Sequence, residues 1–246
     1  MHTTLGDRMK SYEAVWNQIL VPRSPVILRC DGKAFHTLTA KFNKPFDSKL
    51  IHAMNAASLQ LCKEIQGAEL AYVQSDEISI LLHGYKRFNS QPWFDNKVQK
   101  ICSVAASITG VTFSAELSKL LSKDIRAVFD ARVFTLPESE VTNYFYWRQQ
   151  DWIRNSIQML ARSLYSQKQL HGKNTMQLQS MIKENGLSWD EIESHLKYGR
   201  CIVRDTVMKD YGTCTGSYLE WVIDNNIPVF KDNRPYIEDH LKLLEE

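Results

Sequence analysis

The order of strand-like and helix-like segments limits the possible folds of this 246-residue chain more than any other property of its sequence. Apolar β-branched runs predict buried strands, and apolar residues that recur at helical spacing predict helices. In chain order, the sequence predicts a strand at 25–30, a helix at 50–65, strands at 70–73 and 78–82, a helix at 94–121 and a strand at 127–134. This β-α-β-β-α-β order is the ferredoxin-like arrangement, with helices on one face of an antiparallel sheet. The predicted fold class is therefore α+β.

The chain changes character after the last predicted strand. Pro137 stops that strand, and residues 137–246 read as mostly helical, with more charge and more Gln and Asn. We therefore expect two regions, a sheet-containing domain at 1–136 and a helical C-terminal extension at 137–246 that packs on it.

The composition excludes several classes of protein. Hydrophobic residues make up 43% of the chain and charged residues 24%, which is typical of a soluble globular protein. The longest uncharged stretch, 101–115, is too short and too rich in Ser and Thr to cross a bilayer, and residues 1–8 lack the apolar core of a signal peptide. The five cysteines form no CxxC pair, which argues against a disulfide framework and a cysteine-based zinc site. We expect a cytoplasmic protein without a membrane partner.

Carboxylates follow two of the predicted strands. Asp31 ends the first strand, while Asp76 and Glu77 lie in the short hairpin between the second and third. The first and third strands of this fold are antiparallel neighbours, so Asp31 and Asp76 should meet at one edge of the sheet. Two close carboxylates repel each other unless a cation lies between them or one is protonated. Such hard oxygen ligands suit Mg²⁺, and two Mg²⁺ ions can support phosphoryl or nucleotidyl transfer.

The segment after the first strand has a composition that suits phosphate binding. Gly32 allows a tight turn, the next backbone N–H groups could line a triphosphate, Lys33 could add charge, and His36 could contact a phosphate or a base. The same residues also fit a simpler interpretation. Asp31 can be a turn residue before glycine, Asp76-Glu77 a solvated hairpin tip, and His36 a structural histidine.

Five segments together resemble the motifs of one known family. They are Leu28–His36, Lys44–Asp47, Tyr72–Glu77, Phe129–Val133 and Tyr146–Asp151. The first is close to R-x-D-G-x-x-F-H and the third contains Q-S-D-E. In this order, over about residues 29–155, they resemble the tRNA(His) guanylyltransferase superfamily, the 3′-to-5′ polymerases that include the Thg1-like proteins.

The resemblance implies a polymerase-type palm that holds two Mg²⁺ ions. By motif match, the metal ligands are Asp31, the Gly32 carbonyl and Asp76, and the catalytic carboxylates are Asp31, Asp76 and Glu77. The nucleotide-binding residues carried over are Asp31, Gly32, Lys33, Ala34, Phe35, His36, Lys44, Ser75 and Asp76. The implied substrates are tRNA, ATP, and GTP or another nucleoside triphosphate. ATP activates a 5′-monophosphorylated tRNA, and the 3′-hydroxyl of the incoming nucleotide then attacks the activated 5′ end.

One departure from the family pattern bears on the substrate. Eukaryotic guanylyltransferases carry H-I-N-N after W-R-Q-x-D, whereas residues 152–156 here read W-I-R-N-S and keep only the first Asn, Asn155. This resembles the Thg1-like branch, which favours template-dependent repair of 5′-truncated tRNA. Addition of a single G to tRNA(His) stays an alternative.

The family resemblance also implies partners. Arg132, Arg148, Arg154 and Asn155 are candidates for contacts with tRNA, because basic residues that meet phosphates give sequence-independent affinity. Family members are typically tetramers, so we expect a homotetramer.

Two other functions share parts of this pattern. A non-catalytic RNA-recognition module has the same strand and helix order, but it needs aromatic residues on its third strand, and residues 78–82 contain none. Another palm-type enzyme, such as a nucleotide cyclase, would share the metal chemistry but would not need the long helical second half.

Overall fold

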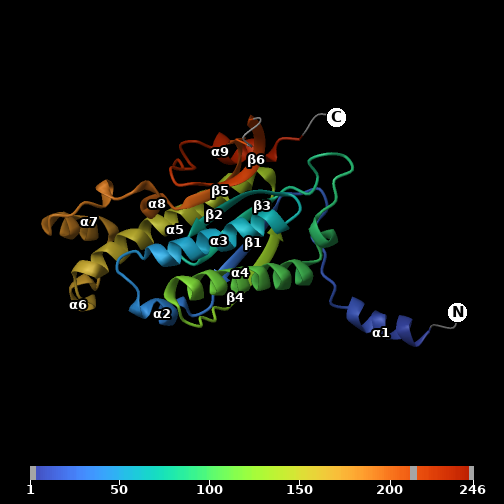
Figure 1. The fold of residues 1–246 in the computed structure, drawn as a ribbon, viewed down its shortest axis with the longest axis horizontal. Helices are drawn as coiled ribbons and strands as arrows, with labels where there is room; N and C mark the ends of the chain where they lie inside the picture. Colours follow the sequence, from blue (N-terminus) through green and yellow to red (C-terminus); the bar gives the residue numbers. More distant parts are fainter. Residues whose placement is uncertain (1–3, 211–214, 244–246) are drawn as a thin grey trace.

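The computed structural model describes residues 4–210 and 215–243, which form one mixed α/β unit around an antiparallel sheet (Figure 1). In these residues the strand order is β4-β1-β3-β2-β5-β6. The strands are β1 (Val26–Gly32), β2 (Ala68–Gln74), β3 (Glu77–Leu82), β4 (Phe129–Thr135), β5 (Arg200–Asp210) and β6 (Thr215–Asp224).

The first four strands and two long helices confirm the predicted β-α-β-β-α-β order. Helix α3 (Ser48–Glu64) lies between β1 and β2, and α4 (Val98–Leu121) lies between β3 and β4. As predicted, Asp47 caps α3, and its carboxylate accepts hydrogen bonds from the backbone N–H groups of Lys49 and Leu50. Both helices cover the same face of the sheet, where alternate strand residues such as Leu28 and Ile80 are fully buried.

Helix α4 is long and apolar enough, by length and composition alone, to cross a membrane. In this fold one side of the helix is buried against α3 and β4, with Ala105, Phe113 and Leu117 fully buried in the core. This is the arrangement of a core helix in a globular domain.

The opposite face of the sheet is covered by α5 (Glu138–Leu164) and by the C-terminal segment. Here Ile27 and Leu81, the strand residues of opposite orientation, pack with Val141, Phe145 and Phe230. The sheet is therefore buried on both faces, which explains why all six residues of β3 are buried.

The second half of the chain contains two strands that the sequence pattern did not predict. Strand β5 pairs with the edge of β2, with Val73 opposite Arg200, and β6 pairs with β5 along the whole hairpin. The short helices of this half are α6 (Gln167–Leu170), α7 (Thr175–Glu184), α8 (Ser194–Tyr198) and α9 (Pro235–Glu238). Two further helices, α1 (Leu5–Ala14) and α2 (Phe35–Leu38), flank β1 in the sequence. The division at residue 136 stays a prediction.

Candidate active site

Carboxylates gather where β1 ends. In the strand register, Asp31 lies opposite Glu77 of β3 on one side and opposite Asp130 of β4 on the other. Directly opposed residues of antiparallel strands point to the same face. Asp76 is in the turn just before β3, and its backbone oxygen accepts a hydrogen bond from the Gly32 N–H at 3.1 Å. The structure thus brings the Asp31 and Asp76 segments together, as the topology predicted.

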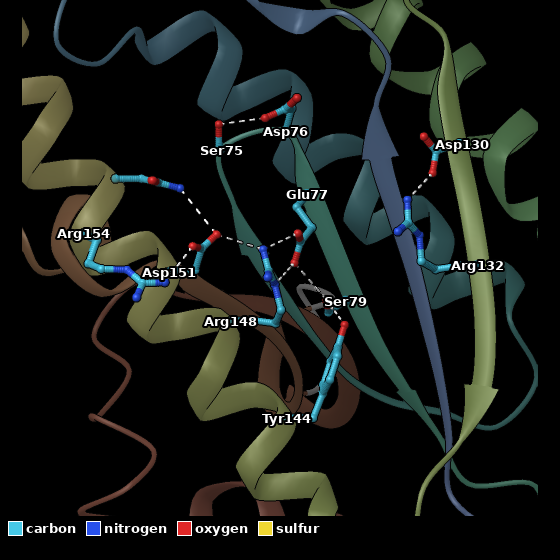
Figure 2. Close-up of polar contacts among 11 residues, drawn as sticks. Ser75, Asp76, Glu77, Ser79, Asp130, Arg132, Tyr144, Arg148, Asp151 and Arg154 are labelled. Atoms are coloured by element: carbon cyan, nitrogen blue, oxygen red, sulfur yellow. Dashed lines mark hydrogen bonds and ion pairs between the residues drawn. The ribbon is translucent and has the colours of Figure 1, made fainter.

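The electrostatics of Asp76 reflect this convergence. Burial is the largest cause that raises the pKa of its carboxyl, and the charges of Asp31 and Glu77 raise it further. The Ser75 hydroxyl donates a hydrogen bond to Asp76 Oδ1 at 2.8 Å and opposes that rise (Figure 2). The site therefore concentrates negative charge in a partly desolvated place, where a cation would favour the ionised carboxylates.

The donor atoms at this strand end fit Mg²⁺. In the described part of the chain, no cluster of three or more His, Cys, Asp or Glu side chains could hold a metal by itself. Mg²⁺ commonly needs only one or two carboxylates, because substrate phosphates and water complete its coordination. Asp31, Asp76 and the Gly32 carbonyl supply hard oxygen donors of this kind.

Glu77 differs from the other two predicted catalytic carboxylates. It is 5% exposed, and the Arg148 guanidinium on α5 donates to both of its oxygens, from Nε to Oε1 at 2.7 Å and from Nη2 to Oε2 at 2.6 Å (Figure 2). Ser79 Oγ donates a further hydrogen bond to Oε1 at 3.2 Å. The carboxylate thus joins β3 to α5, and its catalytic role stays a prediction.

A pocket of about 510 Å³ lies beside the strand end. Seven of the predicted nucleotide-binding residues line it: Gly32, Ala34, Phe35, His36, Lys44, Ser75 and Asp76. Asp31 and Lys33, which were also predicted to bind the nucleotide, do not line this pocket. The rest of its wall comes from the segment 39–47, from residues of α3, α4, α5 and α8, and from Arg200 at the start of β5.

Phe35 anchors the loop that forms one wall of the pocket. Its ring packs against Phe113 and Phe129, with centroids 5.3 and 5.1 Å away. A Cβ atom at position 32 would lie 2.3 Å from the Phe35 ring, so only glycine fits there. Ala34 has a φ of 56°, which turns the backbone sharply into α2. The local packing therefore holds the backbone of 32–36 in a fixed position at the pocket.

Comparison with known proteins decides the family. A family model described as tRNAHis guanylyltransferase, Thg1, matches residues 6–137, more than half of the chain. The chain belongs to the Thg1 family.

Individual relatives agree with that result. A bacterial Thg1-like protein in complex with ATP is 38% identical, with a TM-score of 0.89 over 98% of this chain and 100% of that chain. A bacterial Thg1-like protein in complex with GTP is 36% identical, with a TM-score of 0.82 over 97% of this chain and 99% of that chain. A tRNA(His) guanylyltransferase of Debaryomyces hansenii is 28% identical over 206 residues, which cover 76% of each chain. The Thg1 family is a nucleotidyltransferase family, and the palm-like fold of this member is confirmed.

The residues predicted to touch tRNA lie in two different environments of this Thg1-family chain. Arg132 and Arg154 are exposed, and they pair with Asp130 at 2.9 Å and with Asp151 at 3.0 Å (Figure 2). Arg148 is buried and paired, so the structure gives no support to its predicted contact with tRNA. Asn155 is half-buried, and its side-chain amide donates to Asp151 at 3.5 Å.

Three lining residues of the pocket were not predicted from the sequence. Arg162 of α5, His195 of α8 and Arg200 of β5 all line it. These residues follow the matched motifs in the chain and belong to no motif of their own. Only the unpredicted pairing of β5 with β2 brings Arg200 to this pocket of the Thg1-family chain.

Proposed function

We propose that this Thg1-family chain is a 3′-to-5′ nucleotidyltransferase that adds nucleotides to the 5′ end of tRNA. We further propose that it repairs 5′-truncated tRNA against a template, after ATP activates the 5′-monophosphate. The supporting relatives are the bacterial Thg1-like proteins described above, whose structures are complexes with ATP and with GTP.

The observation that carries the proposal is the position of the pocket. It has the size of a small-molecule site and opens at the strand end where Asp31 and Asp76 meet. A triphosphate held by the Gly32–His36 backbone and Ser75 would lie beside these carboxylates. The nucleotide and its reacting phosphate would then share one partly desolvated site, which is the arrangement that nucleotidyl transfer requires.

We propose Mg²⁺ as the cofactor, with two ions held by Asp31, Asp76 and the Gly32 carbonyl. When bound, the ions would activate the attacking hydroxyl and stabilise the leaving oxygen. The protein's own residues contribute position. The Ser75 hydroxyl holds one oxygen of Asp76 by a hydrogen bond. Arg148 neutralises the carboxylate of Glu77, so that Glu77 does not compete with Asp31 and Asp76 for the metal ions.

Local packing near Asn155 supports the repair activity over addition of a single G. Ser156, where the eukaryotic H-I-N-N pattern has its second Asn, is fully buried and accepts a hydrogen bond from Trp189 Nε1 at 3.0 Å. A larger asparagine would not fit this position without rearrangement of the Trp189 contact. The packing around position 156 therefore suits a serine and not the second Asn of the eukaryotic pattern.

A non-catalytic RNA-binding module is a weaker candidate. Base stacking on such a module needs exposed aromatic residues on the sheet. Strand β3 is buried along its whole length, and α5 covers the face opposite α3 and α4.

A primer-extension experiment tests the proposal. A 5′-truncated tRNA with a labelled 5′-phosphate is incubated with the protein, ATP, Mg²⁺ and each nucleotide in turn. Extension by the nucleotide complementary to the opposite strand supports repair. Addition of one G to full-length tRNA(His) alone supports the guanylyltransferase alternative, and absence of any product contradicts both.

We also propose a homotetramer. Large apolar side chains are exposed on the β5–β6 hairpin, where Met208 is 66% and Leu219 is 64% exposed, and on α4, where Val111 is 71% exposed. Light scattering should give a mass about four times the 28.5 kDa of one chain, and a monomer would contradict this proposal.

A further inference from the structure

Arg200 is a buried arginine that lines the pocket proposed to bind the nucleotide. It is the first residue of β5, it is 2% exposed, and it lines the pocket together with Arg162 and His195. Arginine is almost never so completely buried unless it has a partner. The question is therefore what its charge binds.

Hydrogen bonds hold the Arg200 side chain in place, but they do not neutralise its positive charge. Its Nε donates to the Asn55 side-chain oxygen, and its Nη2 donates a long hydrogen bond of 3.5 Å to the Ile51 carbonyl on α3. Both acceptors are uncharged. Within residues 4–210 and 215–243, Arg200 forms no ion pair, and its Nη1 makes no hydrogen bond.

The backbone that carries Arg200 is fixed on both sides. Gly199 has a φ of 81° and passes so close to Tyr72 that a Cβ atom would lie 2.6 Å from its ring. The Tyr72 hydroxyl donates to the Tyr198 carbonyl at 2.9 Å, and Gln149 Nε2 donates to the same oxygen at 3.4 Å. The guanidinium is therefore presented to the pocket by a rigid support, as a binding residue requires.

Among the residues that the structure describes, the two carboxylates that line the pocket, Asp47 and Asp76, form no ion pair with Arg200. Asp47 accepts hydrogen bonds from three backbone N–H groups, those of Asn43, Lys49 and Leu50. Asp76 lies beside Asp31 at the strand end. Burial lowers the pKa of Arg200 to about 10, so the side chain is still charged at pH 7. A buried charge without a counter-charge is costly, and an anionic ligand would offset that cost.

We propose that Arg200 binds a phosphate group of a substrate in this pocket. The inference rests on the proposed function, which supplies two phosphate-bearing substrates, a nucleoside triphosphate and the 5′ end of an RNA. Nη1, which makes no hydrogen bond to the described residues, can donate charge-assisted hydrogen bonds to a phosphate oxygen. Arg162 lines the same pocket and adds a second positive charge to its wall.

Binding measurements on Arg200→Met test this assignment. By titration calorimetry we expect affinity for GTP and for inorganic tripolyphosphate to fall about 10- to 100-fold, the value of a charge-assisted hydrogen bond, while affinity for guanosine is unchanged. A 5′-phosphorylated and a 5′-hydroxyl tRNA acceptor hairpin form the second arm. If Arg200→Met loses affinity only for GTP and tripolyphosphate, the phosphate that Arg200 binds belongs to the nucleotide. If it loses affinity only for the 5′-phosphorylated hairpin, that phosphate belongs to the RNA.

Two further variants control for folding and position. Arg200→Lys keeps the charge without the planar fork and should lose less affinity than Arg200→Met. Arg204→Met makes the same substitution four residues along β5, at an exposed arginine stacked on Trp221 outside the pocket, and should bind every ligand like the wild type.

The outcomes separate this inference from the proposed function. If Arg200→Met binds GTP, tripolyphosphate and the 5′-phosphorylated hairpin like the wild type, or loses affinity for guanosine as much as for GTP, the inference is wrong and the proposed function stands. If the wild type binds none of the ligands and extends no RNA, the proposed function itself is wrong.

Discussion

Glu77 and Arg148 form a buried, two-pronged ion pair that joins β3 to α5 beside the candidate active site, with N–O distances of 2.7 and 2.6 Å. The pair neutralises the carboxylate that follows Asp76 directly in the chain. Asp31 and Asp76, at the same strand end, have no basic partner among the described residues. The contacts therefore distinguish Glu77, a carboxylate with a structural ion pair, from Asp31 and Asp76, the two carboxylates proposed to bind metal.

Removal of Arg148 should destabilise the protein strongly. Arg148→Met leaves Glu77 buried without its counter-charge, which costs about 3–5 kcal/mol of the free energy of unfolding. Urea denaturation measures this loss. Arg154→Met, an exposed arginine on the same helix, should cost less than about 1 kcal/mol. The double variant Glu77→Leu/Arg148→Met should recover most of the stability, and a single Arg148→Met variant as stable as the wild type would contradict the role of the pair.

Two glycines with similar backbone φ allow a matched test of the turn before Arg200. Gly199 has φ 81° and ψ −165°, a region populated almost only by glycine, and a Cβ there would clash with Tyr72. Gly186 has φ 79°, and a Cβ there would meet nothing within 4 Å. In urea denaturation, Gly199→Ala should therefore lose at least about 2 kcal/mol more stability than Gly186→Ala. Equal losses would show that Tyr72 does not restrict this turn.

His83 should make the fold sensitive to mild acid. Burial lowers the pKa of its imidazole below 6.5. Nδ1 has no hydrogen-bond partner among the residues that the structure describes, and Nε2 lies 3.2 Å from the Leu241 carbonyl. The Glu69–Lys86 pair acts on the charge of both His83 and His240, and the Tyr85 ring stacks on His83 with centroids 4.0 Å apart.

The sign of the effect follows from that lowered pKa. The unfolded chain binds the His83 proton first, so the free energy of unfolding should fall as the pH drops from 7 to 5. The urea midpoint of His83→Gln should fall less over this range. His52→Gln, at a mostly exposed histidine, should follow the wild type. The prediction fails if His83→Gln shows the full wild-type pH dependence.

The first half of the fold was predictable because its local signals agree with one another. The strands β1, β3 and β4 carry apolar runs ended by turn residues, and Asp47 caps α3 as the sequence indicated. The meeting of Asp31 with Asp76 followed from topology, since neighbouring antiparallel strands place the end of one beside the start of the other.

The rest depended on contacts that no local pattern encodes. Strand β5 mixes short apolar runs with charged residues and has no clear strand periodicity, and it is stabilised by pairing with β2, more than 100 residues away in the chain. Arg148 lies three residues before Asp151, so the sequence suggested a local pair. The structure adds Glu77, 71 residues earlier, as its main partner. Arg200 reaches the pocket only because of the β2–β5 pairing.

Nucleotide transfer by Asp31→Asn and Asp76→Asn tests the central claim most directly. Both changes keep the side-chain shape and remove the negative charge, and Asp124→Asn, at an exposed aspartate paired with Arg126, is the matched control. With truncated tRNA, ATP, Mg²⁺ and the complementary nucleotide, each active-site variant should stay folded and lose activity by about 100- to 1,000-fold or more, while the control keeps it. Near-normal transfer by either Asp31→Asn or Asp76→Asn would contradict the assignment of this strand end as the catalytic centre.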